Sequence, residues 1–250
     1  MNERQKQLRL FALELMAKME RPHSGRVLSA IDLMEAWYFG EDAGKPIFNY
    51  NPLVPQWEER DIFVLSKLEA LPALYAVLHF AQYTLPAALP ELPTRKIPGI
   101  EVSAVAHAHG LSASVGLAQA MQMDRQHRHV FCLLGDYELR HGEAWEAIMT
   151  AAERKLDRLC LIVDENDPQD LMLQERFEAF GWKVIKLPDA HDHDEIAYAY
   201  VRARLSNRKP TVILARSIKS KGVPFAERKP EYDDTVFSEV EMQEIRSLLI

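Results

Sequence analysis

Cysteine is scarce in this sequence of 250 residues. The two cysteines, Cys132 and Cys160, each lie inside an apolar run that we expect to form a buried strand. Single buried thiols of this kind are typical of a hydrophobic core rather than of a disulfide or a metal-binding pair. The cysteine pattern therefore argues against a disulfide-stabilised scaffold and favours a reducing compartment.

Clustered positive charge and long apolar runs are also missing. The formal net charge is −7 and no basic cluster occurs, which argues against binding to a nucleic-acid backbone. The charged start MNERQKQLRL lacks the apolar segment of a signal peptide, and no run approaches the ~18 apolar residues that a membrane span needs. We therefore expect a cytoplasmic protein that binds neither nucleic acid nor membrane.

Apolar residues make up 48% of the chain, enough to bury a substantial core. Internal repeats, low-complexity tracts and linkers are absent from the sequence. We therefore expect residues 1–250 to form a single domain.

The segment 130–166 predicts a strand, a crossover helix and a second strand. Two apolar runs, residues 130–134 and 159–163, end in turn residues, as buried parallel strands do. Between them, apolar side chains recur at helical spacing, at Trp145, Ile148, Met149 and Ala152. The sequence therefore predicts an α/β fold with a mostly parallel sheet between helical layers, completed by strands at residues 62–65, 183–187 and 211–215.

Polar residues follow both central strands. Asp136 follows the first and Asn166 follows the second, so parallel pairing brings them to the sheet edge where open α/β sheets bind ligands. A carboxylate and an amide oxygen suit Mg²⁺. Ordinary turn chemistry is the alternative explanation, because both residue types are common in loops.

The chain resembles the transketolase family in several motifs that keep their order over nearly its whole length. The central motifs are Gly135-Asp136, Glu138-Leu139, Gly142, Trp145-Glu146-Ala147, Lys155-Leu156-Asp157 and Val163-Asp164-Glu165-Asn166. Others are His23-Ser24-Gly25, Arg60-Asp61, Phe63-Val64-Leu65-Ser66-Lys67, Pro98-Gly99-Ile100-Glu101 and Lys221-Gly222-Val223. The resemblance implies the three-layer α/β/α fold that binds thiamine diphosphate.

Site residues follow from the resemblance one by one. Thiamine diphosphate and Mg²⁺ are the implied cofactors, with Asp136, Asn166 and the backbone carbonyl of Pro168 as metal ligands. The cofactor is expected beside Gly135, Asp136, Tyr137, Glu138, Asn166 and His107. Catalytic positions are His23, which faces substrate and cofactor in the family, His107, and Glu146 in an interface network. The alternatives are a solvated turn for His23, drift for His107 and a solvated helix face for Glu146.

Several motif positions depart from the family. Leu68-Glu69 replaces a Gly-His pair and places a carboxylate where the diphosphate is expected. Tyr137 replaces a glycine, and Val105 and Ala108 replace glycines of a loop that approaches the cofactor. Family histidines are missing near Glu69, Leu89 and Glu231, and others appear at His107, His109 and His141. The segment after Asn166 is shorter than in the family, so a cover of the site is missing.

Two further clusters allow a second interpretation. His191-Asp192-His193-Asp194 suggests a metal site, but it also matches a family loop that precedes a helix. Lys219 and Lys221 suggest a phosphate contact, with a solvated loop as the alternative.

The resemblance covers the half of transketolase that holds the diphosphate. It therefore implies a subunit that requires a separate C-terminal subunit, self-associates as an α₂β₂ tetramer, and transfers a two-carbon ketol or related acyl unit from a ketose or keto-acid donor. Two alternatives remain open: a catalytically silent subunit with a structural or regulatory role, and a pocket that binds another phosphate or anion.

Overall fold

The computed structural model describes residues 1–166 and 172–249. Its centre is a parallel sheet in the order β3-β4-β5-β7-β6, formed by β3 (Ile62–Leu65), β4 (Val130–Gly135), β5 (Leu159–Glu165), β6 (Lys183–Leu187) and β7 (Thr211–Arg216). All five strands begin within one residue of the predicted positions, which confirms the predicted parallel sheet.

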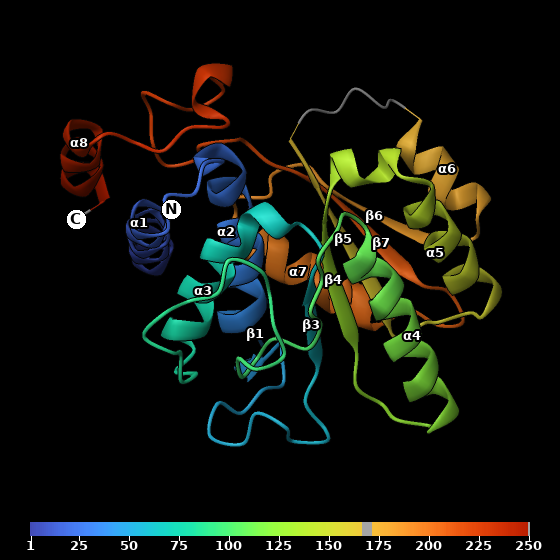
Figure 1. The fold of residues 1–250 in the computed structure, drawn as a ribbon. Coiled ribbons are helices and arrows are strands. Elements are labelled where there is room, and N and C mark those ends of the chain that lie inside the picture. Colours follow the sequence, from blue (N-terminus) through green and yellow to red (C-terminus); the bar gives the residue numbers. More distant parts are fainter. Residues whose placement is uncertain (167–171, 250) are drawn as a thin grey trace.

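Helices cover both faces of the sheet (Figure 1). One layer contains α4 (His109–Met123), α5 (Gly142–Glu153) and α6 (Leu173–Ala179). The other contains α1 (Glu3–Lys18), α2 (Ser24–Phe39), α3 (Leu71–Phe80) and α7 (His193–Arg204), and α8 (Glu239–Leu249) packs beside α1. The three-layer α/β/α architecture is therefore confirmed.

Each face of the sheet has its own hydrophobic core. On the α2 side, the fully buried Trp37 contacts Phe131 and Tyr200, with its ring centroid 4.7 Å from that of Tyr200. On the α5 side, Phe177 packs against Trp182 with ring centroids 5.6 Å apart. Alternating residues of each strand supply the two cores, because successive side chains point to opposite faces.

Shorter elements complete the described chain: the hairpin of β1 (Glu41–Asp42) and β2 (Lys45–Pro46), and the 3₁₀ turns η1 (Leu68–Ala70), η2 (Asp136–Arg140) and η3 (Pro230–Tyr232). Both cysteines are free and buried, as predicted, and burial raises the pKa of each thiol. Over the described residues, none of the helices combines the length and apolarity needed to cross a membrane.

Candidate functional site

The carboxyl ends of β4 and β5 meet as predicted. Gly135 pairs with Asp164 in the parallel register, so Asp136 and Asn166 follow at the same edge of the sheet. The backbone N–H of Asn166 donates to Asp136 Oδ2 over 3.0 Å, and the N–H of Tyr137 donates to Asp136 Oδ1 over 2.8 Å. The structure therefore brings the two residues together, with the Asp136 carboxylate held by backbone donors.

The side-chain amide of Asn166 points into the protein. Its Oδ1 accepts a hydrogen bond from Lys67 Nζ over 3.1 Å, and its Nδ2 donates to Asp164 Oδ1 over 3.1 Å and to Ser217 Oγ over 2.6 Å. An amide oxygen that accepts from an ammonium group is unsuited to bind a cation at the same time.

Lys67 places an internal cation at these strand ends. Its side chain and that of Asp164 are fully buried, and Nζ lies 2.6 Å from Asp164 Oδ2. Ser29 Oγ and Asn166 Oδ1 each accept a hydrogen bond from Nζ over 3.1 Å. All three N–H donors of the ammonium group are thereby used, which is the condition for a stable buried charge.

Glu138 connects three loops. Its carboxylate accepts hydrogen bonds from the backbone N–H groups of Gly135 and Ala108, both over 2.8 Å, and from Ser66 Oγ over 2.7 Å. The residue is fully buried, and burial raises its pKa although these three donors oppose that shift. Glu138 therefore ties the loop before α4 to β3 and β4, with its carboxylate facing inward.

Tyr137, Glu69 and Arg26 form a compact cluster, which we call the Tyr137 cluster. The Tyr137 hydroxyl donates to Glu69 Oε2, and Arg26 Nη1 lies 3.1 Å from Glu69 Oε1. The Arg26 guanidinium also stacks over the Tyr137 ring, 5.2 Å from its centroid. Burial opposes the ionisation of Glu69, but Tyr137, Lys67 and Arg26 outweigh it and lower the pKa of this carboxyl.

The Tyr137 ring fills the space over the end of β4. A Cβ atom built on Gly135 would lie only 2.4 Å from Tyr137 Cε1, because the ring packs directly against this glycine. His107 extends the packing, with its ring 5.2 Å from that of Tyr137 and 5.3 Å from that of His141. His107 Nδ1 is buried and has no hydrogen-bond partner among the described residues.

The remaining predicted site residues lie around this centre. His23 Nδ1 is 2.5 Å from Asp234 Oδ1, and Asp234 is also 3.8 Å from Arg26, so His23 borders the Tyr137 cluster through the C-terminal segment. The His23 hydrogen bond lowers the pKa of Asp234. Glu146 is exposed on α5. Pro168 lies outside the described residues.

The expected diphosphate and magnesium do not fit the residues in this arrangement. The ring of Tyr137 covers Gly135, the ionised Glu69 lies where phosphate oxygens are expected, and the Asn166 amide is engaged by Lys67. Binding would require Tyr137 and Glu69 to move and the Asn166 amide to turn.

The histidines after β6 bind carboxylates, which contradicts the metal alternative for this loop. His191 Nε2 accepts from the backbone N–H of Ile218 over 2.7 Å, so Nδ1 carries the proton and donates to Asp32 Oδ2 over 2.7 Å. Arg9 binds the same carboxylate through two nitrogens. Burial raises the pKa of Asp32, but Arg9 and His191 outweigh it and the net shift is downward.

His193 predicts a pH-dependent contribution to stability. Its Nδ1 lies 2.6 Å from Oε2 of the buried Glu35, and this hydrogen bond raises the pKa of His193 above 6.5. Because the folded pKa is the higher one, the stabilisation is complete below pH 6.5 and is lost as the pH rises through the folded pKa. We expect His193→Gln to lower the free energy of unfolding by about 1 kcal/mol at pH 5.5, allowing for partial exposure, and by less at pH 8.5.

Urea denaturation at the two pH values measures this difference. His127→Gln, on an exposed loop, is the control and should show no such trend. An equal effect of His193→Gln at both pH values would contradict the assignment.

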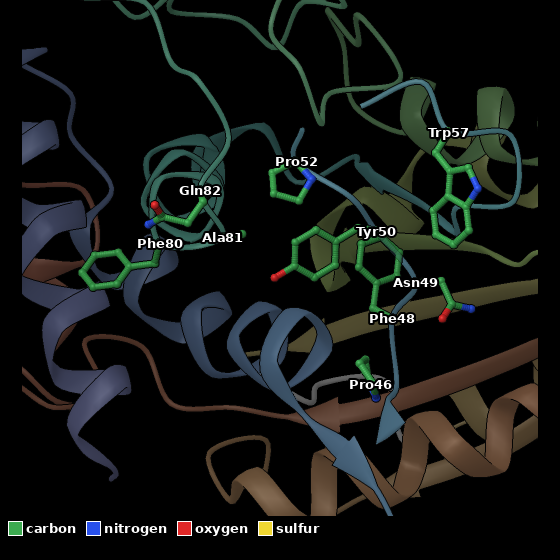
Figure 2. Close-up of a pocket in the computed structure, with 9 residues that line it drawn as sticks. All are labelled: Pro46, Phe48, Asn49, Tyr50, Pro52, Trp57, Phe80, Ala81 and Gln82. Carbon is green, nitrogen blue, oxygen red and sulfur yellow. The ribbon is translucent and has the colours of Figure 1, made fainter. Parts of the chain in front are cut away.

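A separate apolar pocket lies near the amino end of β3, where the N–H of Asn49 donates to Asp61 Oδ2 over 3.1 Å (Figure 2). Its volume is about 520 Å³, and its walls include Phe48, Tyr50, Trp57 and Phe80. Phe48 and Tyr50 stack with ring centroids 5.8 Å apart. Its lining contains no acidic, basic or histidine side chain, so it does not resemble a catalytic centre.

Comparisons with known proteins identify the family. A family model described as "Transketolase, thiamine diphosphate binding domain" matches residues 2–249. The "6-deoxy-6-sulfo-D-fructose transketolase subunit SqwG" of Clostridium sp. (strain MSTE9) is 35% identical, over 89% of this chain and 86% of its own. An apulose-4-phosphate transketolase subunit of Phocaeicola vulgatus is 32% identical, over 86% of this chain and 81% of its own.

Solved structures agree with the fold. The crystal structure of the transketolase of Campylobacter jejuni subsp. jejuni superposes with a TM-score of 0.88 and 26% identity, covering 100% of this chain and 43% of the other. Human transketolase is 32% identical over 90% of this chain and 38% of its own. The chain thus spans about two fifths of these longer transketolases.

Proposed function

The chain belongs to the transketolase family of thiamine diphosphate-dependent transferases, and on that premise we propose that it is the N-terminal subunit of a two-subunit transferase. A separate C-terminal subunit would complete the site in an α₂β₂ assembly. The reaction would transfer a two-carbon ketol or related acyl unit from a ketose or keto-acid donor. We place the protein in the cytoplasm and treat residues 1–250 as one domain.

The match of residues 2–249 to this one domain of transketolase carries the proposal. Relatives named as transketolase subunits are matched over 86% and 81% of their length, whereas human transketolase is matched over 38%. The similarity is therefore concentrated in the part that belongs to one subunit of a divided enzyme.

Within the proposed site, Asp136 and Asn166, together with the Pro168 carbonyl, would hold magnesium once the Asn166 amide turned away from Lys67. Thiamine diphosphate, when bound, supplies the chemistry of acyl-anion transfer in this family. His107, whose Nδ1 has no partner among the described side chains, is our candidate for proton transfer, and His23 for contact with substrate. Glu146 is exposed on α5, which supports its assignment to a subunit interface.

The Tyr137 cluster favours a second candidate, a silent subunit that retains the fold and the partner surface. Arg26 neutralises Glu69 within the chain and the Tyr137 hydroxyl donates to it, so the closed arrangement is internally stabilised. A site closed by its own ion pair does not need a ligand to balance its charge.

Calorimetric titration distinguishes the two candidates. Thiamine diphosphate with Mg²⁺ is titrated into the chain mixed with its candidate C-terminal subunit, after gel filtration has shown that the two assemble. The transferase proposal predicts micromolar binding, worth about 8 kcal/mol, and its loss in the Asp136→Ala variant. If the cofactor did not bind to the assembled subunits, the transferase proposal would be contradicted and the silent-subunit candidate would be supported.

A further inference from the structure

A crevice separate from the apolar pocket lies at the carboxyl ends of the neighbouring strands β5 and β7. After β5 the chain passes to α6, which packs in the core on the α5 side, whereas after β6 it passes to α7 in the opposite layer. β7 lies between β5 and β6, so the strand order reverses here. Open α/β sheets bind ligands at such reversals, outside the carboxyl ends of the strands.

The structure has a cavity at this reversal. Its volume is about 410 Å³, and its walls lie where the three strands end: Glu165 and Asn166 at the end of β5, Pro188 and Asp189 just after β6, and Arg216 and Ser217 at the end of β7. The segment after β7 adds Lys221 and Arg228. Three cationic side chains thus meet two carboxylates in one crevice.

Two of these cations have no hydrogen-bonded counter-ion. The guanidinium groups of Arg216 and Arg228 form neither hydrogen bonds nor ion pairs with other residues in the described parts of the chain, and both residues are exposed. The third cation, Lys221, lies 3.9 Å from Glu227, a loose pair. By contrast, Lys219, the other sequence candidate for a phosphate contact, is paired with Asp233 at 2.6 Å.

The opposing polar groups leave an excess of positive charge. Asp189 Oδ1 accepts from the backbone N–H of His191 over 2.9 Å, and His191 is itself engaged by Asp32. Glu165 is the last residue of β5 and is buried. Within the walls of the cavity, only Glu165 and Asp189 supply carboxylates that could balance the guanidinium charges of Arg216 and Arg228.

We propose that this crevice binds the phosphate group of a small molecule, held by Arg216 and Arg228 with Lys221 as a third cation. Guanidinium groups match phosphate oxygens in geometry, and an ammonium group adds a point charge. The crevice shares Asn166 with the candidate cofactor site, but its cations lie outside the Tyr137 cluster. The inference therefore goes beyond the proposed function and stands whether or not the cofactor binds.

Calorimetric titration of the full chain with inorganic phosphate is the test, against sodium chloride of equal ionic strength. We expect millimolar binding of phosphate, weakened at least tenfold in Arg216→Gln/Arg228→Gln. The control pair Arg95→Gln/Arg125→Gln removes the same charge from exposed positions and should bind as the parent does. If the double variant does not fold, Arg228→Gln alone should still weaken binding at least threefold.

Glucose 6-phosphate and glucose serve as further probes. If glucose 6-phosphate binds more tightly than phosphate and glucose does not bind, the crevice is a site for a phosphate ester. If phosphate binds more tightly than glucose 6-phosphate, it is a site for the free ion. Equal phosphate affinity in the double variant and the control pair would overturn the proposal. So would the absence of binding at about 50 mM phosphate, well above the expected millimolar dissociation constant.

Discussion

Replacement of Lys67 by methionine is expected to lower the free energy of unfolding by about 3–5 kcal/mol. Lys67 and Asp164 are both fully buried and lie 2.6 Å apart, so the variant leaves the Asp164 carboxylate without its cation in the interior. Urea denaturation with a fluorescence readout measures the change. The large effect comes from the unpaired charge that remains, since methionine has nearly the volume of lysine.

Two further variants identify the cause. Lys67→Met/Asp164→Asn removes both charges and should recover a large part of the loss. Lys209→Met removes a lysine from an exposed position and should change stability by less than about 0.5 kcal/mol. If Lys67→Met were as stable as Lys209→Met, the buried ion pair would not support the fold as the structure indicates.

The triple variant Leu68→Gly/Glu69→His/Tyr137→Gly is expected to tighten the binding of thiamine diphosphate with Mg²⁺ by about 100-fold in the assembled protein. It removes the ring that packs on Gly135 and the carboxylate that would face phosphate oxygens. A like charge at ~4 Å costs about 4 kcal/mol at an effective dielectric constant of ~20, so the carboxylate alone accounts for an effect of this size. Calorimetric titration of the variant, mixed with its candidate C-terminal subunit, measures the affinity.

Glu58→His is the matched control, because it makes the same charge change on an exposed loop. It should leave cofactor affinity unchanged. Arg26→Ala adds a second check, since it leaves Glu69 without its cation and should not improve binding. An unchanged affinity in the triple variant would show that the Tyr137 cluster is not what opposes the diphosphate.

Local sequence patterns were sufficient for the sheet. Short apolar runs bounded by turn residues predicted β4 and β5 nearly to the residue, because burial on both faces requires apolar side chains at every position of a central strand. Parallel pairing then required Asp136 and Asn166 to lie at one edge, and their contact is present. Periodicity carries this information because strand geometry repeats every two residues.

For the histidines after β6 the same patterns left two interpretations, a metal site and a loop that precedes a helix, and the structure supports the loop. His191-Asp192-His193-Asp194 has a composition that suits a metal, yet His191 binds Asp32 and His193 binds Glu35, both on α2. Composition cannot reveal that a helix from another part of the chain supplies the partners. Asp192 does cap α7 by accepting from the N–H groups of Asp194 and Glu195, as a loop before a helix would suggest.

The sequence by itself determined the family, the succession of strands and helices along the chain, and the meeting of Asp136 with Asn166 at the sheet edge. It also identified Glu69 and Tyr137 as departures from the family. Only the tertiary structure decided that Arg26 neutralises Glu69 and that Lys67 pairs with Asp164, 97 residues away. The physical reason is range, because ion pairs and hydrogen bonds act over a few ångströms between residues that the fold, and not the order of the chain, brings together.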